Sequence, residues 1–290
     1  MNTLHIKMRN KAKRAFTLIE IMVATVIMVV LVGLVIQITS EVLKVWTRSS
    51  GKLAANAEAR IAMDMITQDL ETAVFRNNGQ QWLRVEAPID PNGVYTDQTV
   101  SLKLFSPALD RPTGPGDICA IGYRLAYKKS YDGASAPDVY ALYRRVTAPK
   151  TTFDSFLGAA NDASSPQLTL SSGSLWADTG VDSITDEENY LAGNIVEFKV
   201  LVYEQPATIG AAVVPSNASS AGKLTSDYAY GGSGGSTDLL LYADIILTVV
   251  SDTGLEMLDN LDNIPEDATE VVTQHGDTFI RRVNFMAHPL

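Results

Sequence analysis

The feature that most constrains this chain is an apolar run of 21 residues from Phe16 to Ile36. Only four residues of other kinds lie inside it: Thr17, Glu20, Thr25 and Gly33. As an α-helix the run would measure about 31 Å, and the hydrocarbon core of a bilayer is roughly 30 Å thick. We therefore expect a membrane-spanning helix at this position.

Basic residues before the apolar run indicate its orientation. Residues 1–15 contain five Lys or Arg and no Asp or Glu, whereas Glu41 and Lys44 follow the run. The positive-inside rule then places the N-terminus in the cytoplasm and exports the remainder of the chain. A cleavable secretory signal also has a basic start, but its apolar core is only about 7 to 15 residues long and ends at a small-x-small cleavage site. This run is longer and lacks such a site.

The helical pattern continues beyond the apolar run. Apolar residues recur mostly at steps of three or four, as one face of a helix requires; they are Val42, Val45, Trp46, Leu53, Ala57, Ile61, Met65, Leu70 and Val74. The first proline is Pro88, and Asn77 to Gly79 form a stop signal. We expect one helix from Phe16 to about Arg76, with an amphipathic exported half over residues 37–76.

Glu20 is the exceptional residue of the apolar run. A carboxylate costs about 2.5 to 3.5 kcal/mol at the bilayer centre and less near an interface. Glu20 therefore either reaches the lipid headgroups or pairs with another group, and composition alone favours neither reading.

Residues 13–24, which read Lys-Arg-Ala-Phe-Thr-Leu-Ile-Glu-Ile-Met-Val-Ala, resemble the type III signal of type IV prepilins and type II secretion pseudopilins. The resemblance implies that a prepilin peptidase cuts between Ala15 and Phe16 and that Phe16 is then N-methylated. It implies that Glu20 serves filament assembly by pairing with the N-terminal amine of a neighbouring subunit. The family usually has glycine before the cut, so Ala15 implies slower processing.

Two departures favour a minor subunit over a major pilin. Many major pilins carry a proline about 22 residues into the mature helix, where this chain has Gln37, and many close a C-terminal disulfide that a lone Cys119 cannot form. A minor subunit sits at or near the filament tip, anchored in the bacterial inner membrane with its domain in the periplasm. Shorter stretches resemble J-type minor pseudopilins and Verru_Chthon cassette proteins: residues 58–70, 122–125, 142–146 and 279–283.

The body after the helix reads as an α+β domain. Alternating runs predict strands over residues 100–105, 118–128, 139–147, 195–203, 239–250 and 278–285. We expect one mostly antiparallel sheet packed on the distal half of the helix. The expected parts are a leader (1–15), a membrane segment (16–36), the exported half of the helix (37–76) and a β-rich domain (77–290).

Two connections, over about residues 148–193 and 205–236, are unusually long. The second is rich in Gly and Ser at residues 217–222 and 231–236, a composition that buries little apolar surface. We expect this second loop to be flexible and without a binding role, and the alternative is that it recognises a partner.

Composition points away from nucleic acid and from catalysis. Without the leader, 18 basic residues face 33 acidic ones, a net charge of −15, whereas phosphate binding needs clustered Lys and Arg. A DNA-uptake pilin is disfavoured on this ground. None of His5, His275 and His288 lies near a credible nucleophile in sequence, and Cys119 falls on the buried face of a strand. We expect neither an enzyme nor a cofactor.

Two groups of acidic residues raise the possibility of a calcium site. These groups lack the alternating ligands and central glycine of a calcium loop; they are Asp182, Asp186, Glu187 and Glu188, and Asp259, Asp262, Glu266 and Asp267. The expected partners are a prepilin peptidase, other pilin-like subunits and the membrane. The alternative from another functional class is a solitary membrane-anchored envelope domain that binds a ligand or polymer.

Overall fold

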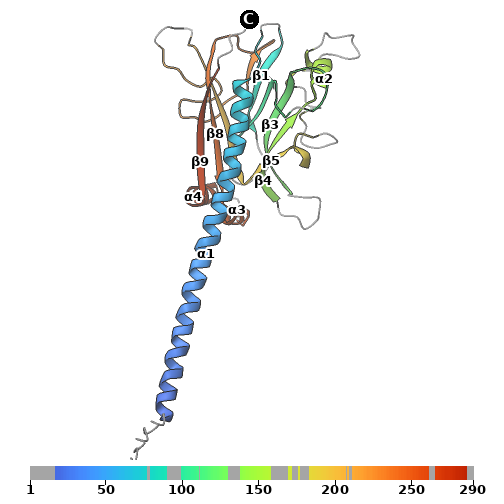
Figure 1. Cartoon of the computed structure of the whole chain (residues 1–290). Coiled ribbons are helices and arrows are strands. Elements are labelled where there is room, and N and C mark those ends of the chain that lie inside the picture. The colour runs from blue at the N-terminus through green and yellow to red at the C-terminus, as the bar shows by residue number, and fades with distance from the viewer. Residues whose placement is uncertain are drawn as a thin grey trace, which may run out of the picture. The chain divides into compact units, whose positions relative to one another are not determined.

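The computed structural model describes residues 17–76, 79–89, 99–110, 112–129, 138–157, 169–171, 176, 183–206, 208, 211–260 and 265–285. The chain divides into two compact units, Met1–Ser49 and Ser50–Leu290. Helix α1, Leu18–Glu71, contributes to both units and is the long helix that the sequence predicts (Figure 1). The second unit is α+β, which confirms the predicted fold class.

Helix α1 ends at Glu71, five residues before the predicted end near Arg76. The Val74 N–H donates to the Phe105 carbonyl oxygen at 2.9 Å. The Thr72 hydroxyl lies 2.7 Å from that of Ser106. Residues 72–76 therefore leave the helix because strand β2, Thr99–Ser106, offers hydrogen bonds at its end. The predicted start at Phe16 lies outside the described residues.

A six-stranded antiparallel sheet has the order β5-β4-β3-β2-β1-β7. Its strands are β1 Gln81–Ile89, β2, β3 Cys119–Lys129, β4 Asp138–Val146, β5 Tyr190–Gly193 and β7 Tyr228–Gly231. Three of these strands, β1, β5 and β7, have no counterpart among the predicted runs. Cys119, at the start of β3, is buried, as expected, and forms no disulfide.

The remaining strands form a separate antiparallel sheet of order β6-β8-β9. They are β6 Ile195–Glu204, β8 Leu240–Val250 and β9 Gly276–Asn284. The expectation of a single sheet was therefore wrong.

Asn194 accounts for the second sheet. Its φ of 59° lies in the left-handed region, which Asn adopts more readily than most residues. Its N–H donates to the Tyr140 carbonyl oxygen of β4, and its own carbonyl oxygen accepts from the Val250 N–H of β8, both at 2.9 Å. One residue thus moves the chain from β5 in the first sheet to β6 in the second.

The C-terminal part of α1 packs on both sheets (Figure 1). Its buried residues are Ala55, Ala59, Ala62, Met63, Ile66, Thr67, Asp69 and Leu70. The predicted apolar face was misplaced, because Leu53 and Ile61 are 67% and 59% exposed. Three of the buried residues are alanines, and a prediction based on large apolar residues gives alanine too little weight.

Short helices follow the strands. They are α2 Pro149–Thr152, the π-helical turn η1 Phe153–Leu157, the 3₁₀ turn η2 Glu187–Asn189, α3 Asp252–Asp259 and α4 Pro265–His275. The hydroxyl of Ser251 caps α3 by accepting from the Gly254 N–H at 3.3 Å.

The 205–236 connection buries more than its composition suggested. Leu224 and Tyr228 are buried, so the expectation that this segment could not bury apolar surface was wrong there. The buried Asn217 amide takes the place of a strand residue beside β6: its Oδ1 accepts from the Val202 N–H at 3.1 Å and its Nδ2 donates to the Val200 carbonyl oxygen at 2.8 Å.

Candidate functional site

The candidate site is the start of α1 and the residues that precede it. Ala15 and Phe16, the predicted cleavage and methylation residues, lie outside the described part of the chain. Glu20 stands in the first turn of α1, where its main-chain N–H donates to the Thr17 carbonyl oxygen at 3.1 Å. A carboxylate in this turn is favoured by the partial positive charge of the helix N-terminus.

The Glu20 side chain is exposed. Within the described residues, no hydrogen bond or ion pair reaches its carboxylate. Any group that compensates this charge in an apolar environment must therefore come from the N-terminal residues outside that part or from another molecule.

Apolar side chains cover the first unit's share of α1. The helix contains a window of mean hydropathy 2.9 that is long and apolar enough to cross a membrane, and none of this window is buried within the chain. Leu18 and Val29, for example, are 77% and 72% exposed. Burial of one such side chain is worth about 1.5 to 3 kcal/mol, so a surface of this kind requires lipid or other apolar helices around it.

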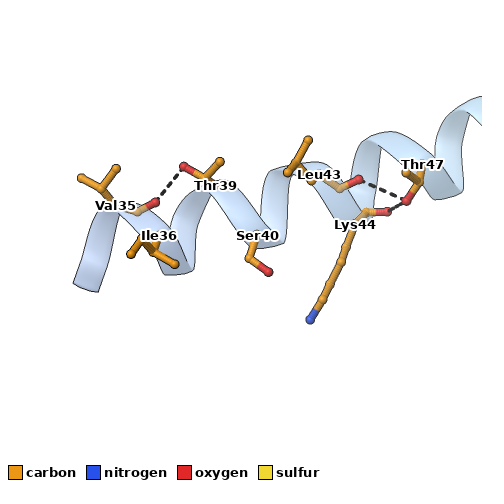
Figure 2. A pocket seen from close by; sticks show the side chains of 7 residues that line it. All are labelled: Val35, Ile36, Thr39, Ser40, Leu43, Lys44 and Thr47. Carbon is orange, nitrogen blue, oxygen red and sulfur yellow. Dashed lines mark hydrogen bonds between the residues drawn. The ribbon is translucent and has the colours of Figure 1, made fainter. Parts of the chain in front are cut away.

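Three threonine hydroxyl groups in this part of the helix are satisfied by the helix itself. The Oγ1 of Thr25 donates to the Met22 carbonyl oxygen at 2.9 Å. Figure 2 shows Thr39 bonded to the Val35 carbonyl oxygen at 2.8 Å and Thr47 bonded to those of Leu43 and Lys44. These threonines can enter an apolar environment without losing their hydrogen bonds.

Lys44 extends away from the helix in Figure 2. It follows the predicted membrane segment, where a long basic side chain can reach the lipid headgroups.

A buried ionic cluster joins α1 to the six-stranded sheet. Arg144 of β4 donates from Nε to Asp69 Oδ2 at 2.9 Å, and Asp69 lies on α1. Tyr123 of β3 donates its hydroxyl hydrogen to the same carboxylate at 2.5 Å. Asp110 accepts from Nη1 and Nη2 of Arg144 at 2.5 and 3.0 Å. The exported end of the helix is therefore held by charge-assisted bonds as well as by apolar packing.

The pKa shifts agree with an ionised cluster. The hydrogen bond from Arg144 lowers the pKa of Asp110, against the opposing effect of burial. Burial raises the pKa of the Tyr123 hydroxyl well above its ordinary value, and the Asp69 charge raises it further. Burial alone would lower the pKa of Arg144, but Tyr123 and the two carboxylates together raise it. At neutral pH Arg144 and Asp110 are therefore charged and Tyr123 is neutral.

Further contacts fix α1 along its length in the second unit. The Asn56 Nδ2 donates to Asp277 Oδ2 at 2.8 Å, and the Lys52 Nζ lies 3.1 Å from Oδ1 of the same carboxylate. The Glu58 Oε2 accepts from the Gly193 N–H at 3.0 Å, beside the residue that switches sheets.

The sequence predicted no role for the residues of this ionic cluster, although three of them lie in stretches that resemble a known family. Asp69, Tyr123 and Arg144 belong to the short stretches that resemble J-type minor pseudopilins, and the structure brings them into direct contact. The sequence signal that could have identified them is a charged residue on an apolar face of a strand. Arg144 lies on the same face of β4 as Leu142 and Val146.

The described residues form no candidate metal site. No group of three or more His, Cys, Asp or Glu side chains there is placed to hold an ion. In the two acidic groups, the described Asp186 and Asp259 stand before η2 and at the end of α3. Asp182 and Asp262 lie outside the described residues, as do His5 and His288.

Comparison with known proteins identifies the N-terminal segment. Residues 10–36 match the family model of the prokaryotic N-terminal methylation motif, so the chain carries that motif, and Ala15, Phe16 and Glu20 lie within it. No curated protein matches the chain at a significant level. Among solved structures, a type IV-like pilin from Thermus thermophilus is similar, with 9% identity, 79% of this chain and 96% of that chain covered, and a TM-score of 0.37.

Proposed function

We propose that this chain is a prepilin-type structural subunit that a prepilin peptidase cuts between Ala15 and Phe16, with N-methylation of Phe16. The observation that carries the proposal is the methylation motif over residues 10–36. The motif extends into α1, whose apolar membrane-length window is not buried against any described part of the chain. Ala15 in place of the usual glycine keeps a small residue before the cut.

Residues 16–36 span the bacterial inner membrane before assembly, with the N-terminus in the cytoplasm and the body in the periplasm. The exposed apolar side chains of α1 support this arrangement, because lipid tails and neighbouring apolar helices both keep them away from water. The same surface can therefore pass from the membrane into the core of a filament without exposure to solvent.

Glu20 pairs with the N-terminal amine of a neighbouring subunit in the assembled state. The exposed carboxylate supports this role, because no described residue compensates its charge. A charge pair formed during assembly offsets the cost of about 2.5 to 3.5 kcal/mol for a carboxylate at the bilayer centre.

Within the filament, the chain acts as a minor subunit at or near the tip of a type II secretion pseudopilus or type IV pilus-like fibre. Gln37 continues α1 where many major pilins carry a proline, and Cys119 is buried and forms no disulfide. Kinship with J-type or Verru_Chthon cassette proteins rests on the resemblance of the short stretches that contain Asp69, Tyr123 and Arg144.

The test compares two glutamates of α1. Glu20→Ala and the control Glu41→Ala are each produced in cells that contain prepilin peptidase and a filament assembly machinery, and sheared filaments are probed for the chain. Both variants should lose the leader, but Glu20→Ala should be absent from filaments while Glu41→Ala enters them. Equal incorporation of the two variants contradicts the assembly role, and absence of the wild-type chain from all filaments supports a solitary membrane-anchored domain.

A further inference from the structure

Strand β9 forms an outer edge of the three-stranded sheet. The Ser251 N–H donates to the His275 carbonyl oxygen, and the Phe285 N–H donates to the Leu241 carbonyl oxygen, both at 3.1 Å. Hydrogen-bonded and non-bonded pairs alternate along an antiparallel ladder. The main-chain groups of odd-numbered β9 residues therefore face β8, and those of even-numbered residues face outward. After Gly276 at the start of the strand, the outward-facing residues are Thr278, Ile280, Arg282 and Asn284.

All four outward-facing residues are exposed. Their outward main-chain groups have no hydrogen-bond partner within the described part of the chain. Ile280 is 68% exposed although it lies in the middle of the strand. An edge of this kind is a template for pairing with another chain.

The other sheet edges that the structure describes are covered or short. Asn217 and Ser216 occupy the edge of β6, where the Ser216 N–H donates to the Val202 carbonyl oxygen at 2.7 Å. Strands β5 and β7 have only four residues each, whereas β9 has nine. The long open edge is therefore β9.

A groove of about 330 Å³ lies between β9 and α1 beside this edge. Its lining residues are Arg60, Met63, Asp64, Phe279, Ile280 and Arg281. A strand added to β9 would place alternate side chains over this groove, because successive side chains of a strand point to opposite faces. Met63 and Phe279 offer it an apolar floor.

Charge in the groove favours an acidic side chain. Arg281 pairs with Asp64, and Arg282 pairs with Asp244 at 2.7 Å. The Arg60 guanidinium lies 5.8 Å from the centre of the Phe279 ring and has no carboxylate partner among the described residues. One positive charge is thus left for a ligand.

We propose that β9 binds an extended segment of another exported protein as an additional antiparallel strand. An apolar side chain of that segment packs on Met63 and Phe279, and an acidic side chain two residues away pairs with Arg60. Main-chain hydrogen bonds to the outward groups of β9 supply the affinity, and the groove supplies the selectivity.

A second copy paired through its own β9 does not fit a common membrane. Lys52 contacts Asp277 and Asp64 contacts Arg281, so α1 and β9 run in the same direction. A symmetric antiparallel β9 pair would point the Ser50–Glu71 helices of the two copies in opposite directions. This exclusion rests on the anchoring proposed above, whereas the strand addition itself does not.

The probe is a fluorescent peptide, Thr-Val-Thr-Glu-Thr-Val-Thr-Glu-Thr, with a control peptide in which Lys replaces both Glu. Binding to the full chain in detergent micelles is measured by fluorescence anisotropy, without prepilin peptidase or assembly machinery. The test therefore fails or succeeds independently of the proposed filament role. We expect saturable binding of the Glu peptide and at least about tenfold weaker binding of the Lys peptide.

Two variants locate the binding. Ile280→Pro removes an outward N–H but no bond to β8, and should weaken binding at least about tenfold, whereas the control Ile280→Val should keep it within about twofold. Arg60 is exposed on α1, and Arg60→Glu should make the chain bind the Lys peptide more tightly than the Glu peptide. This variant tests the proposal even if Ile280→Pro does not fold.

Three results would overturn the proposal. They are no saturable binding to the wild-type chain, no reversal with Arg60→Glu, and equal binding to a folded Ile280→Pro variant. Sedimentation of the chain without peptide adds one more outcome, because a dimer that Ile280→Pro abolishes would assign the edge to a second copy.

Discussion

Asp69→Ala should destabilise the exported body far more than the change of another aspartate on the same helix. Asp69 has only 5% of its side chain exposed, and its removal leaves the buried guanidinium of Arg144 without its buried carboxylate partner. Breaking a buried pair in this way costs about 3 to 5 kcal/mol. Asp110, which is half exposed, still pairs with Arg144, so we expect about 3 kcal/mol.

Asp64 provides the matched control. It also pairs with an arginine, Arg281, but its side chain is 69% exposed. Asp64→Ala should therefore cost at most about 1 kcal/mol. Each variant is unfolded in urea as the full chain in micelles, followed by tryptophan fluorescence. At about 3 kcal/mol per M, Asp69→Ala should lower the midpoint by about 1 M. Equal midpoints for the two variants would refute the role given to the buried cluster.

Three further predictions concern the body. Because its arginine partner lowers its pKa in the folded state, Asp110 should stabilise the fold above its ordinary pKa of 3.8. The stability difference between wild type and Asp110→Asn, from urea midpoints, should persist at pH 7 and vanish only as the pH falls well below that value. Asn194→Ala puts a residue that tolerates the left-handed region less well than Asn at a φ of 59°, and should cost about 1 to 2 kcal/mol. Asn194→Gly should lose less, and equal losses would contradict the strain. Gly122→Ala would put its Cβ 2.5 Å from the Trp176 ring and should cost about 1 to 3 kcal/mol with a change in tryptophan emission, while Gly114→Ala, with nothing within 4 Å, should be silent.

Local pattern was sufficient for most long elements of the fold, but it missed the nine-residue strand β1. The alternation of Val196, Phe198, Val200 and Val202 predicts β6 because its inward face is buried along the whole strand. Strands β5 and β7 escaped detection because four residues such as Tyr190–Gly193 are too few for a period to emerge. The second sheet depends on the left-handed conformation of Asn194, which nothing in the neighbouring sequence requires.

The two parts of the candidate site differ in how far sequence reveals them. The N-terminal part is local: the motif, Glu20 and the apolar run follow one another, so reading in order recovers them. The ionic cluster is assembled from α1, β3, β4 and the segment after β2, and a charge such as Asp69 looks like solvent-exposed helix until Arg144 is placed beside it. The face of α1 was misjudged for the same reason, since alanines become the buried stripe only when a sheet approaches them.

The central claim is processing at Ala15–Phe16, and the N-terminus of the mature chain tests it most directly. The chain is expressed with an active prepilin peptidase and, as the control, with a catalytically inactive one, and the N-terminal peptide is identified by mass spectrometry. The account predicts a chain that begins with N-methylated Phe16 only when the peptidase is active. An N-terminus at any other residue, or one that is the same with both peptidases, would contradict it.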